Sequence, residues 1–199
     1  EGKLVMISGV PTVEDGGIVE DEELGLSAEN VLSYTRMPYQ KVYIEVEEKI
    51  VDKGKDKIKS YDDKITYKRY VSTDWIYSNG ERESSVGDWK KSYENPDPVN
   101  MSSYVNTFDL QLGEFTFSST KASDYIHSDM YKGFSEEELK ENEKCREYIN
   151  NSEIPLEVTT DGNGNGMLSS GDNVGDIHVV ISYNEVESID PVTIIGVQV

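Results

Sequence analysis

One short stretch of the sequence has the composition of a calcium-binding loop. Asp161, Asn163 and Asn165 place side-chain oxygens at positions one, three and five, and Asp172 follows at position twelve. Gly166 stands at position six, where such a loop requires a glycine for its sharp turn. Two formal charges make a weak site, and the preceding residues read as strand rather than helix. A Gly/Asn-rich hairpin loop is therefore the expectation, and calcium binding is the alternative.

Two histidines are the only side chains whose ordinary pKa is close to neutral. His127 is followed by Ser128 and Asp129, which are the residue types of a hydrolase triad. Consecutive side chains point apart, however, and triads are assembled from distant segments. His178 lies within an apolar strand pattern. We expect no catalytic residues, and a hydrolase-like enzyme around His127 or His178 is the alternative.

The charge of the chain is strongly negative. It has 39 acidic and 19 basic residues, a formal net charge of -20. Such a charge repels phosphate backbones, so we predict no nucleic-acid partner. The segment 14–23 holds six acids, and the basic residues gather over 53–69; both are expected to be solvated, as a loop and a hairpin tip. A single cysteine, Cys145, excludes an internal disulfide.

Alternation of apolar and polar residues predicts most of the strands. Residues 177–182 and 192–195 are apolar on both faces, which predicts two central strands of one sheet. Residues 41–51 form the clearest strand of the first half. Residues 31–36 form another strand, which should end before Pro38 because proline lacks the N–H that a ladder needs.

The remaining patterns complete the expected fold. Residues 65–71 return as a strand after 41–51, which indicates a long hairpin. Ser135 and Glu138 have capping-box spacing, so one helix should cover residues 136–150. We therefore predict an α+β fold, a mainly antiparallel β-sheet or open barrel of about seven to ten strands with that one helix. Residues 1–199 are expected to form a single domain.

A set of short segments also occurs in an order shared with a known family. They are Glu1-Gly2-Lys3-Leu4-Val5 with Ser8-Gly9, Leu24-Gly25, Tyr39-Gln40, Trp75, Asn95-Pro96, Leu112-Gly113-Glu114-Phe115-Thr116-Phe117-Ser118 and Gly175-Asp176-Ile177. As an ordered set across the whole chain, they resemble the LUMA family, which comprises transmembrane protein 43 and its bacterial relatives.

The resemblance implies a location and a role. It implies a soluble domain excised from a longer membrane protein, on the extracytoplasmic or lumenal side, between an N-terminal membrane helix and C-terminal ones. The chain opens on Glu1 rather than Met, and its apolar runs are too short to span a bilayer, as expected of such a piece. The resemblance brings no catalytic residue and no cofactor. The expected function is a non-enzymatic module for assembly or partner binding, with a protein partner or self-association.

Overall fold

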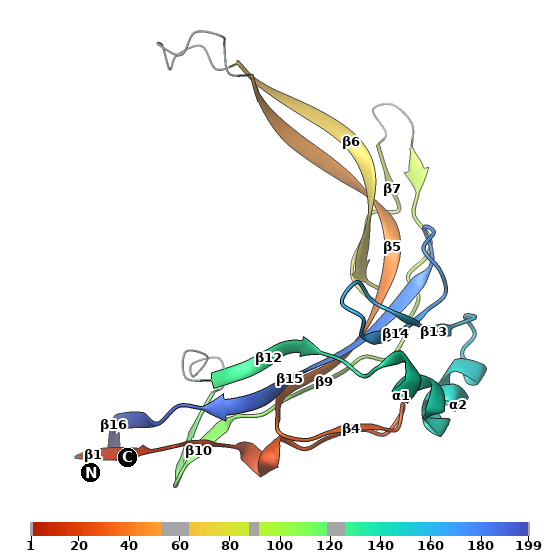
Figure 1. Ribbon diagram of the computed structural model, residues 1–199. Coiled ribbons are helices and arrows are strands. Elements are labelled where there is room, and N and C mark those ends of the chain that lie inside the picture. Colours follow the sequence, from red (N-terminus) through yellow and green to blue (C-terminus); the bar gives the residue numbers. More distant parts are fainter. Residues whose placement is uncertain (1, 53–63, 88–91, 119–125, 199) are drawn as a thin grey trace. The chain divides into compact units, whose positions relative to one another are not determined.

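The computed structural model describes residues 2–52, 64–87, 92–118 and 126–198, and these are mainly antiparallel β structure, as the sequence predicts (Figure 1). The strands are β1 (Lys3–Gly9), β2 (Thr12–Val13), β3 (Val19–Asp21), β4 (Leu26–Ala28), β5 (Val31–Asp52), β6 (Lys64–Tyr77), β7 (Ser85–Val86), β8 (Tyr93–Glu94), β9 (Tyr104–Thr107), β10 (Leu110–Leu112), β11 (Phe115–Phe117), β12 (Ile126–Lys132), β13 (Glu157–Thr160), β14 (Gly166–Ser169), β15 (Ile177–Ile189) and β16 (Val192–Gln198). The helices are η1 (Glu14–Gly17, 3₁₀), α1 (Glu136–Glu141) and α2 (Glu143–Asn151). Strands of two or three residues, too short to give an alternation pattern, raise the number above the predicted seven to ten.

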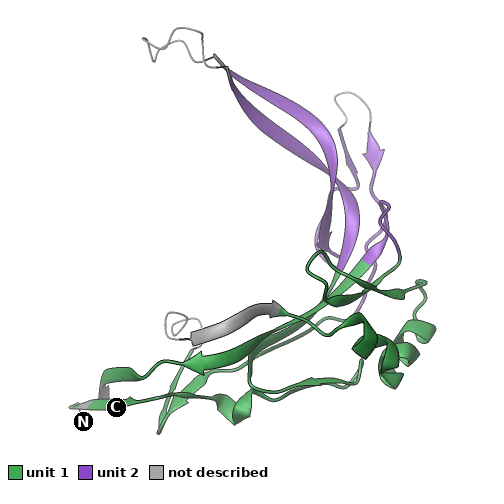
Figure 2. Ribbon diagram, in the orientation of Figure 1, with its two compact units in different colours: residues 1–38, 102–170, 178–199 green, residues 39–101, 171–177 purple. Residues whose placement is uncertain are grey.

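The chain divides into two compact units (Figure 2). The first unit comprises Glu1–Pro38, Ser102–Ser170 and His178–Val199, and the second comprises Tyr39–Met101 and Gly171–Ile177. Strands β5 and β15 contribute residues to both units. The expectation that residues 1–199 form one domain stays a prediction. None of the helices in the described part of the chain is long and apolar enough to cross a membrane.

Strand β15 is a central strand, as its two apolar faces predict. It pairs antiparallel with β14 over one part of its length and with β12 over another, and it neighbours β5 in the same sheet. Beyond these, β13 pairs with β14, and β9 pairs with residues Ser33–Arg36 of β5. Val179 and Ile181 are buried, so the predicted core face of this strand is confirmed.

Strand β16 is not central, contrary to the prediction. Its partner is β1, with which it forms a separate two-stranded antiparallel ribbon, called here the terminal ribbon. Val192 is buried, but Ile195 is 64% exposed. The second apolar face of this segment is therefore an exposed surface, and alternation alone could not distinguish the two cases.

Pro38 does not end the second predicted strand. Strand β5 continues through it for a total of 22 residues. Arg36 is the last residue paired with β9, and Tyr39 is the first residue paired with β6. Pro38 lies where β5 changes partner, so its missing N–H interrupts neither pairing.

The predicted long hairpin is confirmed in the second unit. Strands β5 and β6 pair in register from Tyr39 opposite Tyr77 to Asp52 opposite Lys64. Val42, on the predicted core face, is buried. The tip that connects the strands, residues 53–63 with four of the clustered lysines, lies outside the described residues.

The predicted helix is divided into two. The Ser135 hydroxyl accepts a hydrogen bond from the Glu138 N–H and the Glu138 carboxylate accepts one from the Ser135 N–H, which confirms the capping box. Asn142 has extended backbone angles, ends α1 and caps α2 by accepting from the Cys145 N–H. Leu139 and Cys145 are fully buried, so the predicted apolar stripe persists across the break. An asparagine is a strong N-cap, and here it starts a second helix within the pattern of one.

Two substitutions to aspartate test the assigned faces. Ile181 is 1% exposed, so Ile181→Asp places an unpaired carboxylate in the interior at a cost of several kcal/mol, a large part of a domain's total stability. We expect an insoluble or molten protein by near-UV circular dichroism. Ile195→Asp is the matched control, because the Ile195 side chain is exposed to water. The melting temperature of this variant should stay near that of the wild type. A melting temperature near wild type for Ile181→Asp would contradict the register of β15.

Candidate functional site

The acidic segment 14–23 is largely solvated, as predicted, since Asp15, Glu20, Glu22 and Glu23 are exposed, but it is more than a loop and one of its acids is buried. It contains η1 and β3, and β3 pairs antiparallel with β4. Asp21, the last residue of β3, is 2% exposed and faces Arg36 of β5, which is equally buried. The sequence contained the two charges but could not show that residues 15 positions apart in different strands form a pair.

Around this pair lies a cluster of polar side chains, called here the buried ion cluster: Asp21, Glu23, Tyr34, Arg36 and Ser102. The Asp21 carboxylate accepts from Arg36 Nε at 2.7 Å and from the Tyr34 hydroxyl at 3.0 Å. It also accepts from Arg36 Nη2 and from two N–H groups of the turn that follows it. Arg36 Nη1 donates to the carbonyl and hydroxyl of Ser102, and that hydroxyl donates to the Glu23 carboxylate. Both buried charges are therefore paired and hydrogen-bonded.

Helix α2 lies beside this cluster, and the charges of the cluster affect the pKa values of its side chains. The Tyr148 ring lies 5.8 Å from the Arg36 guanidinium. Burial would lower the pKa of Arg36, but the hydrogen bonds and charge of Asp21 and then of Glu23 raise it. Burial, followed by the Asp21 charge, raises the pKa of the Cys145 thiol to about 11 and also raises the pKa of Tyr34. Because these shifts keep the tyrosine and the thiol protonated, the cluster is suited to hold the fold rather than to transfer protons.

The two histidines do not form one site. His178 lies in β15 opposite Ser169, and His127 lies in β12 opposite Ser188. Ser188 is ten residues along β15 from His178, so the two histidine backbones are roughly 30 Å apart at about 3.3 Å per residue. The side chain of His127 lies outside what the structure describes. The two histidines are therefore too far apart to act together in one site.

The positions of the candidate calcium loop fall in different elements of the fold. Gly166–Ser169, which would supply positions six to nine, form strand β14 between β13 and β15. Asp161 belongs to the first unit and Asp172 to the second. Among the described residues, no three His, Cys, Asp or Glu side chains are grouped so that they could hold a metal ion.

The carboxylates of this loop have other partners. Asp161 Oδ1 accepts from the N–H groups of Asn163 and Asn165, at 2.8 and 2.9 Å, and so closes the β13–β14 turn. Gly166 allows close packing instead of a calcium turn, since a Cβ there would lie 2.7 Å from Leu139 Cδ1. Asp172 makes an ion pair with Lys41 in the second unit. The hairpin-loop expectation therefore describes residues 161–165 correctly.

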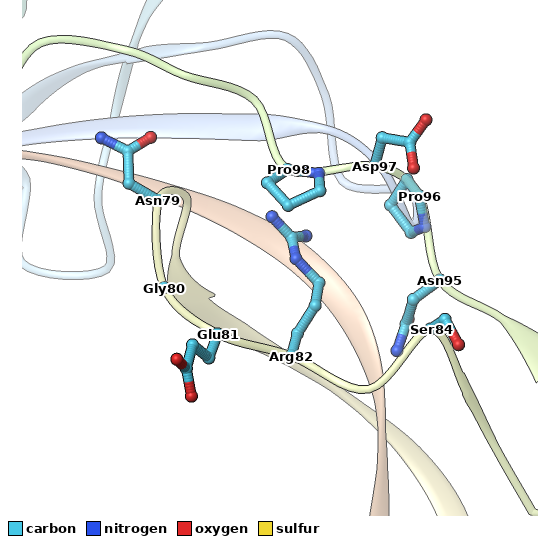
Figure 3. A pocket seen from close by; sticks show the side chains of 9 residues that line it. All are labelled: Asn79, Gly80, Glu81, Arg82, Ser84, Asn95, Pro96, Asp97 and Pro98. Carbon is cyan, nitrogen blue, oxygen red and sulfur yellow. The ribbon is translucent and has the colours of Figure 1, made fainter.

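The second unit contains a cleft of about 510 Å³ (Figure 3). Its lining residues are Asn79, Gly80, Glu81, Arg82, Ser84, Asn95, Pro96, Asp97 and Pro98. Arg82 donates from Nη1 to the Gln40 side chain at 2.6 Å and from Nη2 to the Ser78 carbonyl at 2.7 Å. Burial lowers its pKa and Asp97 opposes that shift.

The polar side chains of this cleft mainly hold its own loops. Asn95 exchanges hydrogen bonds with both the N–H and the carbonyl of Tyr43, as a neighbouring strand would. Arg82 Nε has no hydrogen-bond partner within the described ranges, but it is closed off from solvent and a ligand in the cleft would not reach it. Among the described residues, neither a histidine nor a cysteine lines the cleft.

Most of the large apolar side chains that are exposed in the described residues lie on two elements, which the sequence did not predict. Leu4, Met6 and Ile195 lie on the terminal ribbon, at 64% to 73% exposure. The outer half of the β5–β6 hairpin carries the second group, which is Ile50, Val51, Ile65, Tyr67 and Tyr70. For Ile195 the available signal is an alternation with apolar residues on both faces, which a buried strand and an exposed one share. Exposed apolar groups of this kind are typical of interaction surfaces.

No protein-family model, curated protein or solved structure matches this chain.

Removal of Arg36 should destabilise the fold strongly. Arg36→Ala leaves the Asp21 carboxylate buried without its cation, which typically costs about 3–5 kcal/mol. The urea midpoint should fall accordingly at an unchanged slope. Arg69→Ala is the control, because Arg69 pairs with Glu45 and Glu47 on an exposed surface, where an ion pair contributes little. Equal midpoints for the two variants would show that the buried pair does not hold the first unit.

The Asp161 carboxylate should stabilise the turn without calcium. Asp161→Ala removes the acceptor for two N–H groups, at an expected cost of about 1 kcal/mol. Burial raises the pKa of Asp161, but the hydrogen bonds from Asn165 and Asn163 outweigh it and leave the pKa lowered. The contribution is thus present above the unfolded pKa, about 3.9, and is lost as the pH falls through the folded value. About ten millimolar calcium should leave the melting temperatures of both proteins unchanged; a rise abolished by the substitution would restore the calcium site.

Proposed function

We propose that the chain is a non-enzymatic module for assembly or partner binding in a membrane protein, on the extracytoplasmic or lumenal side. The observation that supports this best is the pairing of the two ends of the chain. In the terminal ribbon, Lys3 lies opposite Gln198 (Figure 1). Segments that continue from both strands would leave from one place, which suits a domain inserted between membrane anchors. The resemblance to the LUMA family implies the same arrangement.

The chemistry of the terminal ribbon supports this location. Met6 lies directly opposite Ile195, and Leu4 lies two residues before Met6, so the three side chains share one face. Lys3 is the one charged residue in the sequence of β1 and β16, although the whole chain carries -20. Anionic headgroups repel acidic surfaces. An uncharged, apolar ribbon at the point of attachment lets an acidic domain lie close to a membrane.

The rest of the structure supports a binding role rather than catalysis. In the buried ion cluster, Arg36 neutralises Asp21, and the Tyr34 hydroxyl donates a hydrogen bond to the same carboxylate. His127 of β12 lies opposite Ser188, ten residues along β15 from His178. Most of the exposed large apolar side chains, by contrast, lie on the terminal ribbon and on the outer half of the β5–β6 hairpin. Surfaces of this kind bind macromolecules, and no chemistry is needed to explain them.

The full-length gene product tests the proposal directly. We expect it to remain in the membrane fraction after an alkaline wash. Asn151 is exposed at the end of α2, so Asn151→Cys introduces a reactive thiol into this domain. In sealed vesicles with the cytoplasmic face outward, a membrane-impermeant maleimide should label this thiol only after detergent is added.

The parent protein without the added cysteine is the matched control. Cys145 is buried and its pKa is raised to about 11, so it should not react in the folded domain. Labelling of Asn151→Cys before detergent would place the domain in the cytoplasm. A full-length protein that is washed from the membrane would overturn the proposal as a whole.

A further inference from the structure

We propose that the free edge of β6, over residues 64–73, binds an extended acidic segment of a protein partner by strand addition. This inference deepens the binding role proposed above and rests on that role. It does not depend on which side of a membrane the domain occupies. Strand addition joins main-chain groups across a sheet edge, while side chains on both faces give specificity.

The edge itself is long and unprotected. Strand β6 has 14 residues and contains neither proline nor glycine. In the part of the chain that the structure describes, its paired neighbour is β5 on one side, and it ends the sheet on the other. Residues 65–70 are all exposed. Natural proteins shorten, cover or interrupt such edges, because their unpaired N–H and carbonyl groups are a template for another strand.

Side chains on both faces of the edge combine apolar and basic groups. Ile65, Tyr67 and Arg69 alternate onto one face, with Tyr67 62% exposed. Lys68 and Tyr70 lie on the other face, where the Lys68 Nζ is 5.6 Å from the Tyr70 ring centroid. An added strand would therefore meet an aromatic ring and a cation on each face.

The charge of the edge selects an acidic partner. Residues 64–73 include three basic residues and no acid, within a chain of net charge -20. Arg69 Nε lies 2.7 Å from Glu47 and Nη1 lies 3.6 Å from Glu45, and Lys68 lies opposite Glu48. These acids of β5 are therefore offset by the same cations that an added strand would meet. Complementary charges steer association and fix the register of an interface. An acidic strand is attracted at this edge and repelled by most of the remaining surface.

A second copy of this chain fits the edge less well. Antiparallel pairing of two β6 edges, in any register that overlaps residues 65–70, sets basic residues of the two copies opposite or diagonal to one another. Like charges in those positions are destabilising, and two chains of -20 also repel at longer range. Nucleic acid fits less well again, because phosphates cannot pair with the N–H and carbonyl groups of a strand.

The test uses synthetic peptides and the whole 199-residue chain. A fluorescent ten-residue peptide that alternates Glu with Val and Tyr should bind, as measured by anisotropy at physiological salt. The same peptide with Lys for every Glu should not bind. A version N-methylated at alternate residues keeps its charge but cannot pair along an edge, so it should not bind either.

Paired variants locate the site. Lys68→Gln with Arg69→Gln should weaken binding of the acidic peptide by up to about tenfold, as expected for two exposed charge pairs. Lys140→Gln with Arg146→Gln is the matched control, because it removes the same charge from exposed positions on α1 and α2 and should leave the affinity unchanged. Melting temperatures of both variants confirm that each is folded.

The remaining outcomes contradict the inference in distinct ways. Absence of binding, or binding unaffected by N-methylation or by the Lys68/Arg69 variant, would overturn strand addition at this edge. Preferential binding of single-stranded DNA would identify a nucleic-acid surface instead. Sedimentation showing self-association through β6 would identify a second copy as the occupant. None of these results alters the vesicle-labelling test, so failure of this inference and failure of the proposed function are separable.

Discussion

The first unit depends on one buried ion pair, that of Asp21 with Arg36. The Asp21 carboxylate accepts five hydrogen bonds, from the turn after β3, from Tyr34 and from Arg36. The Arg36 guanidinium also donates hydrogen bonds to Ser102 and Glu23, and it lies over the Tyr148 ring of α2. A buried charge is tolerated only while its partners stay in place, so the pair fixes the β3–β4 hairpin, β5 and α2 together. An apolar contact of the same area would be less directional.

The second unit uses neutral amides for the same purpose. Gln40 is 1% exposed, donates to the Gly175 carbonyl at 3.1 Å and accepts from Arg82. Asn95 forms hydrogen bonds with both the N–H and the carbonyl of Tyr43, and it also donates to the Glu83 backbone carbonyl. These side chains bind backbone groups at edges that no strand of the described residues covers, because an unpaired buried backbone group is costly. Only 36% of the residues are apolar. Hydrogen bonds from such side chains hold segments together that a larger apolar core would otherwise hold.

Charge distribution connects the fold with the proposed binding role. The chain has a net charge of -20, but its acidic residues are not evenly distributed. The terminal ribbon is almost uncharged, and the outer part of β6 is basic. Leu4, Met6 and Ile195 are exposed on the terminal ribbon, and Ile65, Tyr67 and Tyr70 are exposed on β6. Both are therefore places where another molecule can approach without crossing the acidic surface. Separate surfaces for attachment and for partner recognition are consistent with a module that links a membrane to a protein partner.

Local patterns in the sequence determined the antiparallel β class, the β5–β6 hairpin, the capping box and the buried face of β15, because each depends on neighbours within a few residues. Tertiary structure alone decided the outcome where one pattern fits two environments. The apolar faces of β16 look the same whether a sheet or solvent lies beside them, and Asp21 became a buried partner only because β5 brings Arg36 to it. Gly166 satisfied a calcium-loop spacing, yet the constraint on it is Leu139 of α1. Alternation specifies which residues share a face, but only packing of distant segments determines what that face contacts.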